Sequence, residues 1–411
     1  MSDPSALPSH LEEAHRRLAA GAAQILPEGG LAEKLAAADR AGRPLRVKHG
    51  IDPSGTELTI GHAVVLRKLR QFQDLGHLVV LVVGDFTGMV GDPSGQSITR
   101  RQLTAAQTEA NSATYLDQLM RVLDPDRIEV RRNSEWLAGM TLADVVRETA
   151  VLTVAQLLER DDFAKRFAAH QPISLSEFLY PFLQGYDSVA IEADIELGGT
   201  DQTYNLLVGR DLQRAHGQVQ QVVLTLPLLE GLDGVQKMSK SLGNYVAIAE
   251  PAAEQFGKLM SIPDPLVARY ATLATDLGPD EVAGIERAIA QGGSGANAAK
   301  RQVARAIVAL YHPDPAAEQA EAAFNQVFQR REIPTDVPEV RLPDGDPVHL
   351  PAVLRAAGLV PSTSQARRQL ADGAVRVDGT RLGPDTLDLP RADLVGRVVQ
   401  VGRRHAARLI D

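Results

Sequence analysis

Strand-length apolar runs alternate with helical patterns along the first 250 residues of the chain. Residues 44–52, PLRVKHGID, predict a strand that enters a Pro-Ser-Gly turn, and residues 61–75 predict the helix that follows it. Further strands are expected at 77–84, 127–133, 192–199 and 219–227. Strands separated by helices are typical of βαβ units, so the pattern predicts an α/β fold with a parallel sheet.

The helix expected at 61–75 has one apolar face. Leu69 and Phe72 lie on that face at helical spacing, whereas Arg67 and Lys68 are expected to turn away from it. This is the pattern of a helix that packs on one side and meets solvent on the other.

The rest of the chain departs from the alternation. A helical stretch at about 141–189 interrupts it, and the pattern after residue 250 is again helical. A polar stretch with four spaced prolines follows. After it come two short helices and a hairpin that turns at Asp378-Gly379. We therefore expect a first domain at 1–249 with inserted helices at about 141–189, a helical domain at 250–331, a Pro-rich linker at 332–348 and a small α+β domain at 349–411.

Composition narrows the class of protein. The chain is 44% hydrophobic and has no cysteine, which excludes disulfides, thiol nucleophiles and Cys-ligated zinc. The N-terminus lacks a signal-peptide core, and no apolar run approaches the roughly 18 residues of a membrane span. A soluble, cytoplasmic protein without a membrane partner is expected.

Charge is unevenly distributed along the chain. The net charge is −9, yet residues 350–411 contain ten Arg, no Lys and six Asp. A basic tail on an acidic body indicates a local contact with a polyanion, or else an ordinary difference between domains. Charge alone leaves both interpretations open.

Two stretches are candidates for phosphate chemistry, although neither G-x-G-x-x-G nor G-x-x-x-x-G-K-[ST] is present. The stretch DPSGTELTIGHAVVLRK places Thr59 and His62 where a turn gives way to a helix, and a helix N-terminus can host a phosphate. The stretch GVQKMSKSLGN holds Lys237 and Lys240 between glycines with no carboxylate among them. Taken singly, a structural or solvated histidine and a lysine-rich surface loop are the alternatives.

A third candidate is a polar helical face. YPFLQGYDSVA presents Tyr180, Gln184 and Asp187 at i, i+4 and i+7, and LGGTDQTYN follows with Asp201 and Gln202 after two glycines. The alternative is a helix whose polar groups are satisfied within the protein.

Together these stretches carry a family resemblance. I-G-H at a strand-to-helix turn followed by K-M-S-K-S resembles class I aminoacyl-tRNA synthetases. The spacing from Tyr180 to Asp187, the sequence GGTDQ, and GDPSG at 91–95 are similar to tyrosyl-tRNA synthetases of the bacterial kind, and the likeness covers nearly the whole chain.

The resemblance implies a Rossmann-like catalytic domain that joins tyrosine to ATP and then to tRNA(Tyr), with Mg²⁺ brought by ATP, no permanently bound cofactor and no protein metal site. It implies catalytic roles for Thr59, His62, Lys237 and Lys240. The residues implied for ATP are Asp52, Gly61, His62, Gly199, Asp201, Lys237, Ser239 and Lys240. Those implied for tyrosine are Thr87, Asp92, Tyr180, Gln184, Asp187 and Gln202.

The resemblance extends to the tail and the assembly. Residues 349–409 resemble the small RNA-binding domain named after ribosomal protein S-four, which implies tRNA contacts for Arg367, Arg368, Arg376 and Arg381. The helical domain would face the anticodon arm. A homodimer is implied, with its interface near the inserted helices.

Two residues depart from the commoner family pattern. Thr59 stands where His is common, so its phosphate contact is expected to be weaker. Lys48 stands where many bacterial relatives have a Tyr that touches the phenol, so either this contact is omitted or Lys48 faces away.

The alternatives to a tyrosyl-tRNA synthetase are a tryptophanyl-tRNA synthetase and a catalytically silent RNA-binding relative.

Overall fold

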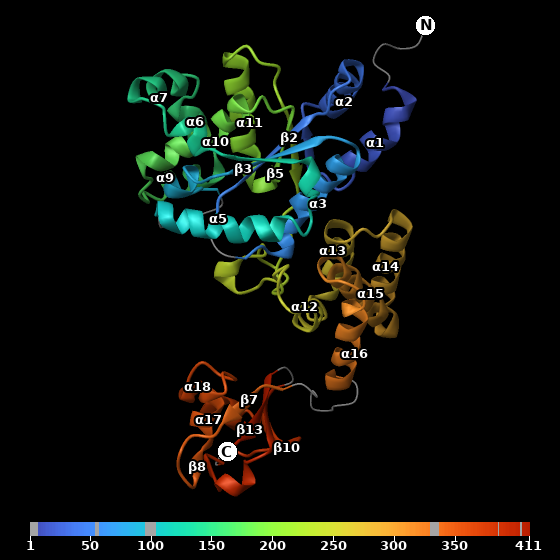
Figure 1. Ribbon diagram of the computed structural model, residues 1–411, viewed down its shortest axis with the longest axis vertical. Coiled ribbons are helices and arrows are strands. Elements are labelled where there is room, and N and C mark those ends of the chain that lie inside the picture. The colour runs from blue at the N-terminus through green and yellow to red at the C-terminus, as the bar shows by residue number, and fades with distance from the viewer. Residues whose placement is uncertain (1–6, 54–56, 95–103, 329–336, 385, 403–404) are drawn as a thin grey trace. The chain divides into compact units, whose positions relative to one another are not determined.

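The computed structural model describes residues 7–53, 57–94, 104–328, 337–384, 386–402 and 405–411. By its internal contacts the chain divides into two compact units, residues 1–251 with 258–313, and residues 252–257 with 314–411. Figure 1 labels their helices and strands. Within the described ranges, no helix is long and apolar enough to cross a membrane.

A six-stranded sheet forms the centre of the first unit, in the order β1-β6-β5-β2-β3-β4. All neighbouring strands are parallel except β1, which is antiparallel to β6. The expected parallel sheet is therefore confirmed. Its strands are β1 (Gln24–Leu26), β2 (Arg46–Ile51), β3 (Leu78–Val83), β4 (Ile128–Arg132), β5 (Ile195–Gly199) and β6 (Val222–Leu226).

Strand order reverses in the middle of this sheet. The chain passes from β2 to β3 and β4 on one side, whereas β5 and β6 extend the other side, so β2 and β5 are neighbours. Right-handed crossovers in opposite directions put α3 (Ile60–Asp74) and α11 (Thr203–Ala215) on opposite faces of the sheet. Such a reversal opens a crevice at the carboxyl ends of the two central strands, which is where ligands bind in open α/β sheets.

Helix α3 buries Leu69 and Phe72 as expected, but Arg67 and Lys68 are buried as well rather than turned to solvent. The Lys68 ammonium donates hydrogen bonds to the carbonyl oxygens of Arg17 and Ala20, at 3.2 and 2.7 Å. These carbonyls lie at the end of α1 (Ser9–Ala19), where carbonyl groups lack helical partners. The prediction was wrong for these two residues because this part of the helix packs against other segments, among them the end of another helix.

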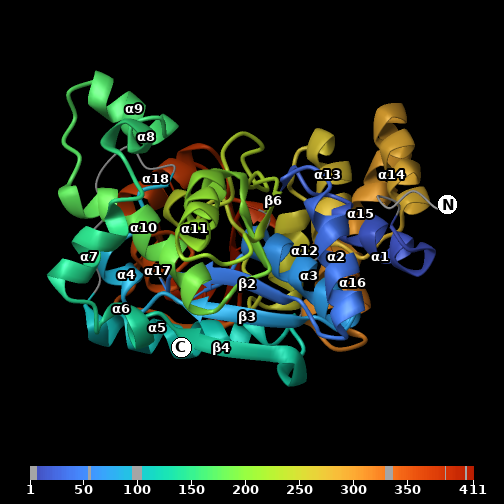
Figure 2. The same cartoon turned by 90° about the horizontal axis from the view of Figure 1, so that it is seen from above.

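A series of helices lies between β4 and β5, where a helical insertion was expected at about 141–189, and the first of them precedes those bounds. The longest of them, α10, packs along α11 (Figures 1 and 2). Gly185 permits this approach, since a Cβ there would lie 2.9 Å from the side chains of Val208 and Leu212. The segment contains α6 (Ser134–Leu137), α7 (Leu142–Thr149), α8 (Val154–Leu157), α9 (Asp161–Ala168) and α10 (Leu175–Ala190).

The remaining helices of the first unit surround the sheet or follow it in the chain. They are α2 (Gly30–Ala41), α4 (Thr87–Val90), α5 (Ala105–Leu119), α13 (Val267–Ala274), α14 (Pro279–Gln291) and α15 (Gly293–Tyr311). In the second unit, Phe256 of α12 (Ala252–Leu259) meets Phe324 of α16 (Ala316–Phe328) edge to face at 5.5 Å.

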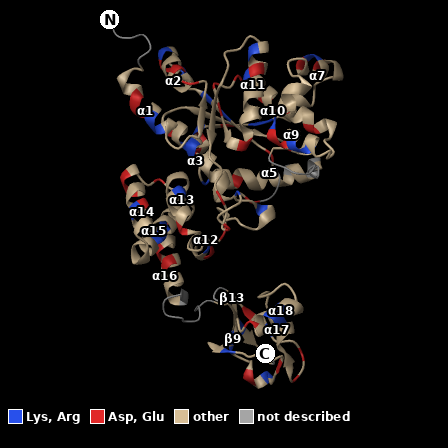
Figure 3. Cartoon of the chain, turned by 180° about the vertical axis from the view of Figure 1, so that it is seen from behind, with Lys and Arg blue, Asp and Glu red and all other residues tan. Residues whose placement is uncertain are grey.

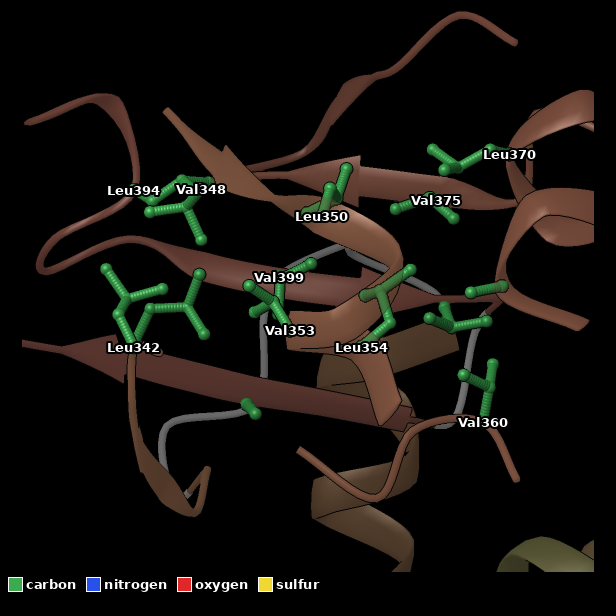
Figure 4. Packing of buried hydrophobic residues seen from close by; sticks show 14 residues of the cluster. Leu342, Val348, Leu350, Val353, Leu354, Val360, Leu370, Val375, Leu394 and Val399 are labelled. Atoms are coloured by element: carbon green, nitrogen blue, oxygen red, sulfur yellow. The ribbon is translucent and has the colours of Figure 1, made fainter. Parts of the chain in front are cut away.

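The end of the chain forms a small α+β domain with its own core. Leu350, Val353 and Leu354 of α17 pack with Leu370 of α18 against the sheet residue Val399 (Figure 4). The sheet has the order β10-β9-β12-β13-β7. The elements are β7 (Glu339–Arg341), β8 (Val348–His349), α17 (Leu350–Ala356), α18 (Thr363–Ala371), β9 (Val375–Val377), β10 (Thr380–Arg381), β11 (Asp388–Leu389), β12 (Val398–Val401) and β13 (His405–Ile410).

This domain begins earlier than the sequence suggested. Strand β7 pairs with β13, and Leu342 and Val348 are buried in the core of the domain. Residues 339–348 were expected in the Pro-rich linker and belong instead to the packed domain, because the apolar residues between the prolines fill its core. Residues 332–336 of the expected linker lie outside the described ranges.

Candidate active site

A cleft of about 680 Å³ lies at the carboxyl ends of β2 and β5, at the reversal of strand order. It is lined by residues from several stretches that lie far apart in the sequence. Among them are all those expected to contact ATP or tyrosine: Asp52, Thr59, Gly61, His62, Thr87, Asp92, Tyr180, Gln184, Asp187, Gly199, Asp201, Gln202, Lys237, Ser239 and Lys240. The fold therefore brings these distant residues together, while their individual roles stay predictions.

The start of α3 is fixed by a reciprocal cap between Thr59 and His62. The Thr59 backbone N–H donates to His62 Nδ1 at 3.2 Å, and Thr59 Oγ1 lies 2.7 Å from the same nitrogen. Because Nδ1 accepts the backbone hydrogen, the ring proton is on Nε2. Thr59 is buried, so its hydroxyl serves the cap, and its expected phosphate contact stays a prediction.

His62 is a neutral donor at the cleft. Its ring is open to the cleft, yet burial by the enclosing protein, together with the smaller effects of the Lys240, His49 and Lys237 charges, lowers its pKa to about 4. A neutral imidazole with hydrogen on Nε2 can donate one hydrogen bond to a phosphate oxygen at the N-terminus of α3.

The two lysines of the GVQKMSKSLGN stretch are held by protein oxygens. Lys237 pairs with Asp201 at 3.0 Å, and Lys240 donates to the Glu57 carbonyl and the Tyr115 hydroxyl, both at 2.9 Å. The loop between them is pinned by Asn244, whose Oδ1 accepts from the Ser239 backbone N–H at 2.8 Å. The result is two ammonium groups on one wall of the cleft.

Asp52 lies at the end of β2 and organises the centre of the cleft. Its two carboxylate oxygens accept hydrogen bonds from Thr87 Oγ1 and the Tyr180 hydroxyl, each at 2.8 Å. Position 84 has to be glycine, because a Cβ there would lie 1.9 Å from Asp52 Oδ1. Burial and the neighbouring carboxylates raise the pKa of Tyr180, which keeps its hydroxyl a donor.

Asp187 forms the deep end of the cleft. Its Oδ1 accepts from the Trp136 indole N–H at 2.9 Å, and its Oδ2 lies 3.4 Å from the Asn133 amide nitrogen. Burial raises the pKa of Asp187 to about 7, although the Lys48 charge and the hydrogen bonds from Trp136 and Asn133 oppose that rise. A buried carboxylate with remaining acceptor capacity suits a ligand hydroxyl.

Lys48 does not line the cleft. Its side chain is fully buried below α10, where the ammonium lies 2.8 Å from Glu196 Oε1 and donates to the Gln184 carbonyl at 2.8 Å and to Ser188 Oγ at 2.7 Å. Of the two readings left open by the sequence, the structure shows the one in which Lys48 faces away from the cleft.

Comparison with known proteins identifies the family. The family described as tRNA synthetases class I (W and Y) matches residues 40–329. The tyrosine–tRNA ligase of Moorella thermoacetica is 52% identical over 395 residues, which are 96% of this chain and 95% of the relative. That of Acidithiobacillus ferrooxidans is 48% identical over 97% of both chains. The chain belongs to the tyrosyl-tRNA synthetase family.

Two further comparisons concern the C-terminal domain and the fold. The S4 domain family matches residues 349–386. Two solved structures share the fold. One is a C-terminally truncated mitochondrial tyrosyl-tRNA synthetase of Aspergillus nidulans, with a TM-score of 0.61 and 22% identity over 78% of this chain and 93% of that one. The other is the tyrosyl-tRNA synthetase of Archaeoglobus fulgidus complexed with L-tyrosine, with a TM-score of 0.58 and 20% identity over 75% of this chain and 98% of that one. The tryptophanyl alternative is not supported.

Sequence reasoning missed several residues that shape this tyrosyl-tRNA synthetase cleft. Trp136 and Asn133 orient Asp187, and Asn244 holds the loop of residues 234–244 that carries the two lysines (the lysine loop). Asn133 ends the strand expected at 127–133 and Asn244 ends the stretch GVQKMSKSLGN, but a single Asn or Trp side chain adds no charge or periodic pattern of its own. The available signal was position: Asn133 follows β4 directly, and residues just after parallel strands line the ligand crevice.

Proposed function

We propose that this chain activates L-tyrosine with ATP to give tyrosyl-adenylate and pyrophosphate, and then transfers the tyrosyl group to the terminal adenosine of tRNA(Tyr). One observation supports this most: a buried carboxylate suited to a phenol, Asp187, shares one cleft with the two lysines and His62. Family membership supports the same activity, and the intact lysine pair argues against a catalytically silent relative.

In the first step the tyrosine carboxylate attacks the α-phosphate of ATP, and pyrophosphate leaves. No protein nucleophile is required, so positioning and electrostatic stabilisation supply the acceleration. Asp92, Tyr180 and Gln184 bind the ammonium group of tyrosine, and Asp187 accepts the phenolic hydrogen. Thr87 supports this site through Asp52, to which it donates a hydrogen bond.

The nucleotide lies on the other side of the same cleft. His62 and the backbone at Gly61 contact phosphate, while Lys237, Ser239 and Lys240 hold the leaving pyrophosphate. Asp201, Gln202 and the backbone of Gly199 hold the ribose and the reacting carboxylate, with Asp52 beside them. We assign Thr59 the indirect role of orienting His62, because its hydroxyl lies 2.7 Å from the ring.

Mg²⁺ enters this scheme with its substrate, as MgATP. Among the described residues, no group of three or more His, Cys, Asp or Glu side chains could hold a metal ion. An ion coordinated mainly by phosphate oxygens and water needs no such group, since Mg²⁺ keeps several of its waters in nucleotide sites.

The small C-terminal domain supplies tRNA contacts. Arg367 and Arg368 on α18, Arg376 on β9 and Arg381 on β10 are exposed, and Figure 3 shows basic residues of this domain in blue. Arginine suits an RNA backbone through its planar, bidentate fork. We also propose that the enzyme works in the cytoplasm, where its tRNA substrate is used.

A chain that ends at residue 328 should still form tyrosyl-adenylate, because every residue assigned to ATP or tyrosine lies before residue 244 and the core of the C-terminal domain is built only from residues 340–409. Transfer to tRNA should fall through weaker binding. The log–log salt dependence of tRNA binding should become shallower by roughly one unit per lost phosphate contact. Loss of adenylate formation together with thermal stability, at an unchanged salt slope, would instead make the domain a structural cap.

We propose that the enzyme is a homodimer that pairs through the inserted helices. Leu142 and Val146 lie one helical turn apart on α7 and are 79% and 64% exposed. Val154, Phe167, Leu175 and Leu179 add exposed apolar area on α8, α9 and α10. Several exposed large apolar residues on one segment of the chain suit an interface.

The double substitution Leu142→Asp with Val146→Asp should convert the dimer to a monomer in analytical ultracentrifugation, because it buries two charges in the contact. Val219→Asp is the matched control, since Val219 is 80% exposed and lies outside the inserted helices. A wild-type monomer at micromolar concentration, or a double variant that stays dimeric, would contradict the proposed interface.

The proposed function is tested by charging. The enzyme with MgATP, tRNA(Tyr) and tyrosine should produce tyrosyl-tRNA, and tryptophan in place of tyrosine should produce none. If a clean preparation of the enzyme shows no tyrosine-dependent charging of tRNA(Tyr), the proposal is refuted.

A further inference from the structure

A buried arginine of the inserted segment lies behind residues that line the tyrosine side of the cleft. Arg160 precedes α9, and its side chain is 4% exposed. Its guanidinium donates to Asn205 Oδ1 at 2.9 Å, to Ser94 Oγ at 3.2 Å and to both oxygens of Asp162. Arg160 also stacks over Phe163, with its Cζ 4.7 Å from the ring centroid.

The contact with Asn205 fixes the orientation of an amide. Arginine has donors and no acceptor, so the Asn205 atom that faces it has to be the oxygen. The Asn205 nitrogen is then turned toward the cleft, where it donates to Gln184 Oε1 at 3.0 Å and to Gln202 Oε1 at 3.1 Å.

The orientation of the Asn205 amide in turn fixes the orientation of the Gln202 amide. With its oxygen directed at Asn205, Gln202 presents its nitrogen to Asp92 and donates to Asp92 Oδ2 at 2.8 Å. The other oxygen of Asp92 accepts from the Ser94 backbone N–H at 2.9 Å. Asp92 and Gln184 are two of the groups proposed to bind the ammonium of tyrosine, and both are therefore aligned by one donor-only residue.

We infer that Arg160 is a positioning residue for the ammonium group of tyrosine, and that it acts by fixing the amide orientation of Asn205 and, through it, of Gln202 and Gln184. Arg160 contacts neither the phenol end of the cleft nor the lysine loop. Without Arg160 the Asn205 amide can turn, so that the Gln184 and Gln202 oxygens lose their common donor and Gln202 no longer has to present its nitrogen to Asp92.

This inference rests on the proposed function, and its test separates the two. Binding to the full-length enzyme is measured by calorimetry for three ligands: tyrosine, tyramine, which keeps the ammonium and lacks the carboxylate, and 3-(4-hydroxyphenyl)propionate, which lacks the ammonium. Wild-type enzyme that fails to bind tyrosine would overturn the proposed function and this inference with it.

For Arg160→Met, the Kd values of tyrosine and tyramine should rise by about tenfold or more, since hydrogen bonds to a charged ligand are lost, whereas the Kd of the propionate should stay unchanged. The KM for ATP in pyrophosphate exchange should also stay unchanged. If Arg160 had a merely structural role, the substitution would weaken the binding of all three ligands alike. Equal losses, or no loss, would overturn the inference.

Two further variants complete the design. Arg166→Met is the matched control, because Arg166 is a buried arginine of the same segment that is paired with Glu177 and lies outside the cleft. It should lower stability without ammonium-selective loss. Asn205→Leu removes the amide that links Arg160 to Gln184 and Gln202 (the relay), while the pair of Arg160 with Asp162 stays in place. It therefore tests the inference even where Arg160→Met folds poorly. It should reproduce the selective loss, and a propionate Kd that rises as much as the tyramine Kd would refute the relay.

Discussion

Replacement of Lys240 by Ala is expected to lower the rate of tyrosine-dependent pyrophosphate exchange by about 10²-fold or more, because a preorganised charge aimed at the leaving group is lost. The Kd of tyrosine measured without ATP should stay close to that of the wild type. Lys240 lies on the wall formed by the lysine loop, where it is held by the Glu57 carbonyl and the Tyr115 hydroxyl, and it has no contact with the residues around Asp187. Lys237→Ala should act in the same direction.

Lys258 supplies the control for this experiment. It is a partly buried lysine that pairs with Glu250 and stacks on Tyr245, and it does not line the cleft. Lys258→Ala should leave the exchange rate nearly unchanged. A large loss of tyrosine affinity in Lys240→Ala would show that the lysine serves the amino-acid site instead of the phosphates.

Replacement of Asp187 by Ala should reduce tyrosine activation by about 10- to 100-fold, because a charge-assisted hydrogen bond to the phenol is removed. Activation of phenylalanine, which has no hydroxyl, should fall far less. The ratio of kcat/KM values for the two amino acids should therefore shrink. Equal losses for both substrates would remove Asp187 from the phenol site.

The pH dependence of tyrosine binding gives a second readout of Asp187. Its pKa of about 7 means that the anionic acceptor is lost as the pH falls through neutrality, so the KM for tyrosine should rise below pH 7. His62 should not contribute, since its pKa of about 4 keeps the ring neutral in this range. Asp187→Asn should abolish the rise.

Asp194 is the matched control for these measurements. It is a carboxylate of similar burial that precedes β5 and pairs with Arg43 and Lys34, away from the cleft. Asp194→Ala should lower thermal stability, because it leaves two cations without their partner, while the ratio of tyrosine to phenylalanine activation stays constant.

The elements of the first unit could be predicted because their patterns are local. The apolar run at β3 and the alternation of strands with helices predict a parallel sheet, and the expected helix at 61–75 is α3 at Ile60–Asp74. The cleft residues could be named because they lie in short stretches that resemble a family.

What failed depends on packing between distant segments. No local pattern shows that Lys68 ends up against the C-terminus of α1, or that Lys48 pairs with Glu196, which is 148 positions further along the chain. The early start of the C-terminal domain was missed for the same reason, since proline spacing suggested a linker while β7 pairs with a strand near the chain end. Trp136, Asn133 and Arg160 act through single contacts that only the fold creates.

If the cleft joins tyrosine to the α-phosphate of ATP, as proposed, the enzyme should make tyrosyl-adenylate without tRNA. The protein is incubated with MgATP and an equimolar mixture of the twenty amino acids, and the enzyme-bound product is identified by mass spectrometry. Tyrosyl-adenylate should be the predominant adenylate, and Lys240→Ala should accumulate it far more slowly. A predominant tryptophanyl-adenylate, or no adenylate from active and folded enzyme, would contradict the account.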